Sequence, residues 1–122
     1  METTTYSRDE KLKRKKDIAL LFEKGRWKTY KHLRVIVYPH DSESKLGVSV
    51  SKRYFKRATD RNRVKRLLRE AYRLNKSLFK EAFGTHYFAM LFWVSPEKPQ
   101  TYEDVRGEFV SLCESVKNKK KD

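Results

Sequence analysis

Residues Lys52–Arg73, KRYFKRATDRNRVKRLLREAYR, are the most informative segment because they combine the helical spacing of apolar residues with a dense positive charge. The segment contains ten Lys and Arg residues and only two acidic residues. Its apolar residues recur at i, i+3, i+4, i+7 and i+8, the spacing of one face of an α-helix. These residues are Val64, Leu67, Leu68, Ala71 and Tyr72. The pattern predicts a folded helix that buries one stripe.

The other side of this helix carries side chains that suit phosphate. At about 100° per residue, a polar set points away from the apolar stripe or lies on its flank. The set comprises Asn62, Arg66, Arg69 and Arg73, with Arg61 and Lys65 on one flank. Arg can hold a phosphate with two parallel N–H bonds. The alternative is a core helix with a solvated basic outside, but such helices normally mix both signs of charge.

The whole chain is strongly basic, with a net charge of +14 over 122 residues. Seven Phe, seven Tyr and two Trp distinguish it from a disordered basic tail and favour one folded domain. Self-repulsion of this size destabilises the compact state, so a polyanionic partner is expected. Nucleic acid is the leading candidate, and an anionic membrane surface is the weaker one.

No motif for side-chain catalysis stands out. The three histidines lack acidic neighbours at ligand spacing, and no HExxH, CxxC, GxxxxGK[ST] or GxGxxG occurs. Cys113 lies in an apolar helical pattern, which favours a buried structural thiol over a nucleophile. As the single cysteine it excludes an internal disulfide. Without a signal-peptide pattern or a long apolar run, a cytoplasmic binding protein is expected.

The first half of the chain predicts a helix followed by strands. Ile18, Leu21 and Phe22 share one side of a helix that Gly25 ends. Trp27–Tyr38 reads as one or two strands, and Pro39–Ser44 as a turn or hairpin loop. Leu46–Ser51 alternates as a strand whose small polar face leaves room for a ligand or simply faces solvent.

The second half continues this alternation. Thr59 or Asp60 can cap the long helix, which runs to about residue 75 and is followed by a short helical piece. Tyr87–Val94 predicts a central buried strand. Thr101 and Asp104 stand at capping-box spacing before a last amphipathic helix. The order α-β-β-β-α-β-α predicts an α/β (α+β) two-layer sandwich. We expect a flexible N-terminus over 1–10, one domain over 11–117 and a basic tail over 118–122.

One run has a specific resemblance. Ala58–Arg69, ATDRNRVKRLLR, preceded by SVSKR, resembles the signature of the protein subunit of bacterial ribonuclease P. That family carries Arg-Asn-Arg-x-Lys-Arg-x-x-Arg on a helix after a strand that ends in Ser-Lys-Lys/Arg. The similarity extends to the first helix, the strand YFAMLFWV and the terminal helix, over roughly residues 8–117. It implies a fold like ribosomal protein S5 domain 2, with a left-handed β-α-β crossover.

The resemblance also implies a function. The family's ribonucleoprotein removes the 5′ leader from precursor tRNA by Mg²⁺-dependent hydrolysis, and its RNA subunit is the catalyst. The protein, one per RNA, binds that RNA and the single-stranded leader, which improves substrate affinity and the use of metal ions. We therefore expect Mg²⁺ to be bound mainly by the RNA, and we expect no catalytic or metal-binding side chain and no membrane partner.

The resemblance assigns residues to two surfaces. The RNA-binding residues are Lys52, Arg53, Lys56, Arg57, Arg61, Asn62, Arg63, Lys65, Arg66, Arg69 and Arg73. The leader cleft takes Ile18, Phe22 and Ser49. Ile18 stands where an aromatic residue is usual, and Phe22 has the alternative role of a plain core anchor.

Two other functions compete with this one. A structural RNA-binding protein or RNA chaperone shares the basic helix but needs no leader cleft. A basic DNA-binding regulator needs a short helix and a tight turn before its recognition helix, whereas a strand and a basic loop precede it here.

Overall fold

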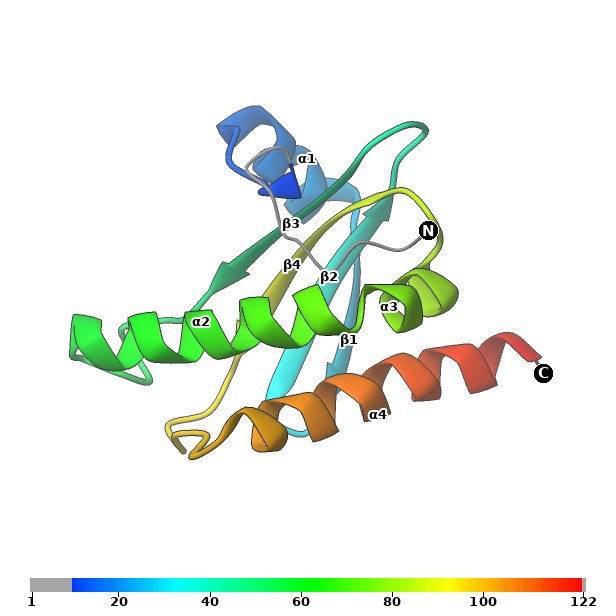
Figure 1. The fold of residues 1–122 in the computed structure, drawn as a ribbon. Coiled ribbons are helices and arrows are strands. Elements are labelled where there is room, and N and C mark those ends of the chain that lie inside the picture. Colours follow the sequence, from blue (N-terminus) through cyan, green and yellow to red (C-terminus); the bar gives the residue numbers. More distant parts are fainter. Residues whose placement is uncertain (1–9, 122) are drawn as a thin grey trace.

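The computed structural model of the chain describes residues 10–121, which form a four-stranded sheet with helices packed on it (Figure 1). The elements are α1 (Lys15–Lys24), β1 (Arg26–Tyr30), β2 (Leu33–Pro39), β3 (Ser44–Ser49), α2 (Ala58–Leu74), α3 (Lys76–Phe83), β4 (Tyr87–Trp93) and α4 (Tyr102–Lys121). This confirms the predicted α/β sandwich, with α3 as the short helical piece after α2. Within the described residues, no helix has the length and hydrophobicity that crossing a bilayer requires.

The sheet has the order β1-β2-β4-β3. β1 and β2 form an antiparallel hairpin that closes between Tyr30 and Leu33. β4 pairs antiparallel with β2 and parallel with β3. β4 therefore lies between β2 and β3, so the connection at Pro39–Ser44 is a turn between strands that do not pair with each other, and its alternative reading as a hairpin loop was wrong. The apolar β4 occupies the centre because it is the strand that must be covered on both faces.

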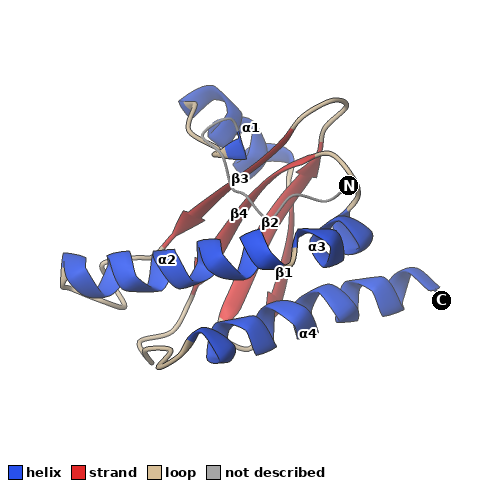
Figure 2. Cartoon of the chain, in the orientation of Figure 1, coloured by secondary structure: helices blue, strands red, loops and turns tan. Residues whose placement is uncertain are grey.

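The crossover that joins β3 to β4 passes through α2 and α3. Because β3 and β4 are parallel neighbours, the chain must return along the sheet before it can form β4. α2 and α3 make this return on the face that α4 also covers (Figure 2). A left-handed sense for this passage, against the general rule for such units, stays what the resemblance implies.

The two faces of the sheet are covered unequally. The larger apolar cluster lies under α2, α3 and α4 and includes the fully buried Phe79, Tyr87 and Phe109. The smaller cluster lies under α1 and consists of Leu12, Leu21, Ile36, Phe88 and Met90. We call the second face the α1 face. A helix of ten residues covers only part of it.

Of the two N-terminal caps that the sequence predicted, the structure confirms one. In α4, the Thr101 N–H donates to Asp104 Oδ2 at 3.1 Å and the Asp104 N–H donates to Thr101 Oγ1 at 3.4 Å, which confirms the capping box. α2 instead begins at Ala58 with Arg57 as an N-cap that makes no side-chain hydrogen bond. The expected cap at Thr59 or Asp60 was wrong.

The chain ends fall partly outside the described residues. The expectation of a flexible N-terminus concerns residues 1–10, of which 1–9 lie outside the description. α4 continues as a helix through Lys121, into the segment that the sequence assigned to a basic tail. Asp122 lies outside the description.

Gly25 ends α1 because of close packing. Its φ of −71° is open to any residue. A Cβ at this position would meet the Leu21 carbonyl oxygen at 2.5 Å and Ile36 Cγ1 at 2.6 Å. Glycine therefore lets α1 turn directly into β1 while lying against β2, which fixes the helix on the α1 face.

Candidate nucleic-acid interface

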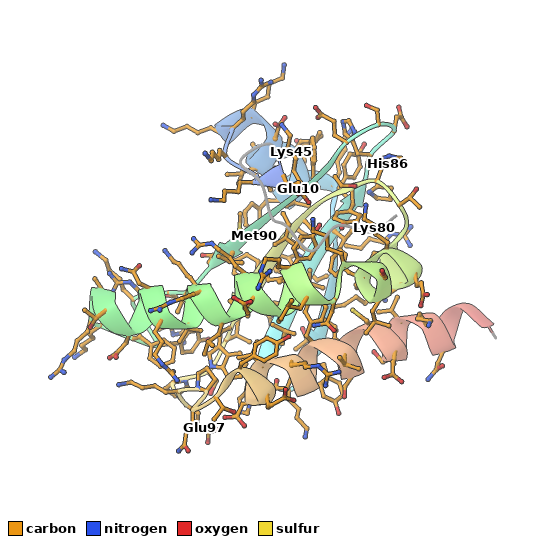
Figure 3. The ribbon with its side chains drawn as sticks, viewed as in Figure 1. Glu10, Lys45, Lys80, His86, Met90 and Glu97 are labelled. Carbon is orange, nitrogen blue, oxygen red and sulfur yellow. The ribbon has the colours of Figure 1, made fainter. Side chains whose placement is uncertain are left out.

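The outer side of α2 presents the expected cations. Val64 and Leu68 are buried against the sheet, whereas Asn62, Arg66 and Arg69 are exposed. Figure 3 shows nitrogen-tipped side chains projecting from this helix. We call Asn62, Arg66 and Arg69 the cationic face of α2. Lys65 and Arg73 flank it and are partly exposed; Arg73 forms an ion pair with Glu70 one turn earlier.

Arg61 holds the basic loop that precedes α2. Its Nη1 donates to the carbonyl oxygens of Phe55 and Lys56 at 2.9 and 2.8 Å. Phe55 is 3% exposed, so the loop is anchored in the core beside the arginine. The loop cations that remain exposed are Lys52, Arg53, Lys56 and Arg57. Arg61 thus positions these neighbours as well as carrying a charge itself.

Arg63 links α2 to the loop after β4. Its Nη1 donates to the Pro99 carbonyl oxygen at 2.6 Å and its Nη2 to that of Gln100 at 2.5 Å. Lys98 and Asp60 form a second link between the same segments, with a 3.1 Å ion pair. The two arginines that flank Asn62 therefore have intramolecular partners, which the motif alone did not reveal.

Three aromatic rings gather at the uncovered part of the α1 face. Phe22 of α1 lies 5.9 Å from Trp27 of β1 and 6.1 Å from Phe92 of β4, and Trp27 lies 5.5 Å from Phe92, between ring centroids. Phe22 is 44% exposed and Trp27 46%. The Arg34 guanidinium lies 5.7 Å from the Trp27 ring centre. We call Phe22, Trp27 and Phe92 the aromatic patch.

Two predicted cleft residues adjoin this patch, and a third belongs to it. Ser49 of β3 pairs with Phe92 of β4, so their side chains lie side by side on the α1 face. Ile18 is half-buried against the apolar cluster under α1. Phe22 is too exposed to be a plain core anchor. The structure thus brings Ile18, Phe22 and Ser49 to one surface.

Sequence reasoning missed Trp27, Arg34 and Phe92. Trp27 lay inside a strand prediction with no assigned face, and Phe92 lay in a strand expected to be buried throughout. The register places Arg34, Phe92 and Ser49 in one row across β2, β4 and β3. Such a row depends on pairing between distant segments, which local periodicity does not specify.

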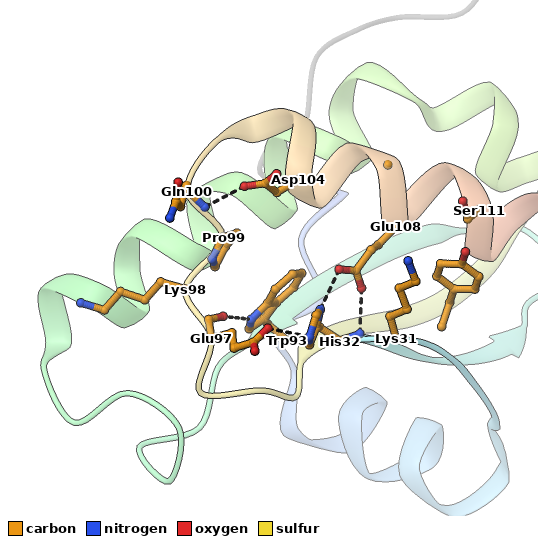
Figure 4. A pocket seen from close by; sticks show the side chains of 12 residues that line it. Lys31, His32, Trp93, Glu97, Lys98, Pro99, Gln100, Asp104, Glu108 and Ser111 are labelled. Carbon is orange, nitrogen blue, oxygen red and sulfur yellow. Dashed lines mark hydrogen bonds and ion pairs between the residues drawn. The ribbon is translucent and has the colours of Figure 1, made fainter.

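His32 joins the turn between β1 and β2 to two other segments. Its backbone N–H donates to Glu108 Oε1 at 2.7 Å, and its Nδ1 lies 2.8 Å from Glu108 Oε2 (Figure 4). Its Nε2 lies 3.1 Å from Glu97 Oε2. The preceding Lys31 has a φ of +50°, so these contacts hold a turn of costly geometry. The residues border a cavity of about 620 Å³.

The described residues offer little for side-chain catalysis. Among residues 10–121, no group of three His, Cys, Asp or Glu side chains is placed to hold a metal ion. Cys113 is buried, and burial, with the nearby Glu114 charge, raises the pKa of its thiol to about 12. Since the thiolate is the nucleophile, this cysteine is unreactive near neutral pH.

Comparisons with known proteins give a consistent result. The family model described as Ribonuclease P matches residues 6–117. The ribonuclease P protein component of Thermotoga maritima is 31% identical over 117 residues, covering 95% of this chain and 93% of that protein. That of Clostridioides difficile is 39% identical over 109 residues, covering 88% and 91%.

The match to the Porphyromonas gingivalis ribonuclease P protein component is more identical but shorter. It reaches 46% over 84 residues, which are 65% of this chain and 61% of that protein, less than two thirds of the relative's length. Among solved structures, the RNase P protein of Staphylococcus aureus gives a TM-score of 0.73 at 22% identity, covering 88% of this chain and 95% of that one. The Thermotoga maritima RNase P protein gives 0.72 at 23%, covering 89% and 96%. At these identities the structures support the fold alone.

Proposed function

Because this chain belongs to the ribonuclease P protein family, we propose that it is the protein subunit of a ribonucleoprotein that removes the 5′ leader from precursor tRNA. In this proposal the RNA subunit carries out the hydrolysis. The protein binds that RNA on one surface and the single-stranded leader on another, one protein to one RNA, in the cytoplasm.

The cationic face of α2 and the loop before it form the surface for the catalytic RNA. Exposed Arg66 and Arg69 can each hold a phosphate, and Asn62 can donate or accept a hydrogen bond beside them. Arg61 and Arg63 act chiefly as positioning residues, since each donates to backbone carbonyl oxygens. Lys52, Arg53, Lys56, Arg57, Lys65 and Arg73 extend the positive surface.

The aromatic patch is the surface for the leader, and its exposure is the observation that carries this part of the proposal. Phe22 and Trp27 are each nearly half exposed beside a partly exposed Phe92. Apolar side chains gathered at a surface commonly mark a binding site. Unpaired bases stack on aromatic rings with little regard to sequence, at about 1–3 kcal/mol per base. A site that must accept many leaders needs this tolerance.

Mg²⁺ is assigned to the RNA in this proposal. Within residues 10–121, the side chains do not come together in a group that fits a metal ion, so no step of the reaction is routed through a protein-bound ion. The protein's part is to bind, position and neutralise polyanions. Neutralisation of phosphates by Lys and Arg reduces their mutual repulsion as the RNA and the substrate come together.

The proposal is tested by precursor-tRNA cleavage at low Mg²⁺, with a bacterial ribonuclease P RNA alone, this protein alone, and both together. Cleavage at the mature 5′ end only in the combined reaction supports the proposal. If the same RNA is active at high Mg²⁺, and the protein binds it tightly yet adds nothing at low Mg²⁺, the function is instead that of a structural RNA-binding protein or RNA chaperone.

A further inference from the structure

Lys15 lies on the same side of α1 as Phe22. It is the first residue of the helix, and Phe22 follows it by seven residues. At 3.6 residues per turn, two side chains seven residues apart leave the helix in directions within about 20° of each other, and they are about 10 Å apart along the axis. Lys15 and the Phe22 ring therefore lie on the same side of α1, at its two ends. The Lys15 end of the helix is near β3, because Leu12, three residues before Lys15, donates its N–H to the Leu46 carbonyl oxygen.

Lys15 has no ion-pair partner among the side chains of residues 10–118. Its side chain is exposed. The first turn of α1 contains Lys15 and Lys16 as well as Asp17, and it follows Arg14, an N-cap without a side-chain hydrogen bond. Cations at a helix N-terminus oppose the helix dipole, and acidic or capping residues are favoured there. A local conflict of this kind is expected where binding, rather than folding, selects the residue.

We propose that Lys15 binds a backbone phosphate of the same single RNA strand whose bases stack on the aromatic patch. The inference rests on the proposed function, since it adds a phosphate contact to the leader site. The ligand chemistry is an RNA phosphodiester. On this proposal the strand runs from Phe22 along the axis of α1, so that one of its phosphates comes within reach of the flexible Lys15 ammonium.

Lys16 supplies a matched control. It neighbours Lys15, has the same charge, is also exposed and lies in the same first turn. At 100° per residue it points about 120° away from Phe22, toward solvent. If the lysines act only through their positive charge, replacing either one should change the affinity for precursor tRNA equally. If a strand on the aromatic patch contacts Lys15, only the replacement of Lys15 should change that affinity.

The experiment compares Lys15→Glu and Lys16→Glu in the assembled ribonucleoprotein. We measure affinity for precursor tRNA and for mature tRNA at a Mg²⁺ concentration too low for cleavage, over a series of salt concentrations, together with assembly of protein and RNA. Thermal unfolding of each free protein shows that it folds. Both substitutions remove a cation from the N-terminal turn, so both raise the unfolding temperature.

Lys15→Glu alone weakens precursor binding, roughly fivefold, as for one exposed ion pair. The salt slope of precursor binding falls by about 0.7, the value for one phosphate on a single strand. Mature-tRNA affinity and RNA assembly stay unchanged. Equal effects of the two substitutions, or no effect of either, overturn the proposal. Weaker RNA assembly by Lys15→Glu overturns it in favour of a contact with the catalytic RNA.

Phe22→Ala in the same assay separates this inference from the proposed function. If it abolishes the preference for precursor tRNA while Lys15→Glu does not change that preference, the leader site stands and the lysine contact is wrong. If neither substitution changes the preference, the leader site itself is wrong.

Discussion

Replacing Arg63 and Arg66 with alanine, one at a time, should have different consequences although both belong to the same basic run. The first substitution should lower the stability of the protein, and the second should weaken its assembly with RNA. Arg63 donates to the Pro99 and Gln100 carbonyl oxygens at 2.6 and 2.5 Å. Hydrogen bonds from a charged group are each worth about 1.5–3 kcal/mol when buried. Because Arg63 is partly exposed, hydrogen bonds to water can compensate part of the energy that is lost with these two bonds. We therefore expect Arg63→Ala to lower the free energy of unfolding by about 2 kcal/mol in total. For a chain of 122 residues this is a fall of roughly 8 °C in Tm.

Arg66 is exposed on the cationic face of α2 and makes no such link to the part of the chain that the structure describes. We expect Arg66→Ala to change the free energy of unfolding by less than about 0.5 kcal/mol and to weaken assembly with the catalytic RNA. Arg69→Ala should behave in the same way.

Urea unfolding followed by circular dichroism measures the free energy of unfolding, and titration of the folded proteins with RNA measures the affinity for the catalytic RNA. Arg63→Lys is the control, since a lysine retains the charge but lacks the planar fork that reaches two carbonyl oxygens. It should recover little of the stability. Wild-type stability of Arg63→Ala, or loss of folding in Arg66→Ala, would refute the assignment of the two side chains.

Three further predictions follow from the same structure. Phe22→Ala should reduce the preference of the ribonucleoprotein for precursor over mature tRNA, by competition binding; an unchanged preference would make Phe22 a packing residue. Gly25→Ala should destabilise the protein by about 2 kcal/mol or more, through overpacking against Ile36; a wild-type melting curve would show that α1 can shift. Burial raises the pKa of Cys113 to about 12, so it should resist alkylation at pH 8 until urea unfolds the chain; rapid labelling of the folded protein would contradict this.

Element types were predictable because most segments have a local signature. The amphipathic spacing of α2 and the capping box at Thr101 and Asp104 need only neighbours in the sequence, and the structure confirms both. The apolar Tyr87–Trp93 is the central strand because its composition suits a position covered on both faces.

Strand order and the finer roles of side chains depend on distant segments. The insertion of β4 between β2 and β3 depends on pairing between segments far apart in the sequence, which Pro39–Ser44 does not reveal. Arg63 reads as one more cation until its partners 36 and 37 residues away are known. Similarly, His32 had no acidic neighbour in sequence, yet the fold places Glu97 and Glu108 at its ring.

The unequal covering of the two sheet faces has a thermodynamic consequence. Three helices seal one face, whereas the α1 face keeps Phe22 and Trp27 in contact with water. A strand that stacks there removes apolar surface from water, so its binding should carry a negative heat-capacity change. The contacts that we propose between α2 and the catalytic RNA are ionic, so they should weaken as the salt concentration rises. In the proposed function, the two polyanionic partners are therefore held by forces with different responses to temperature and ionic strength, and raising the salt should release the partner on α2 before the one on the aromatic rings.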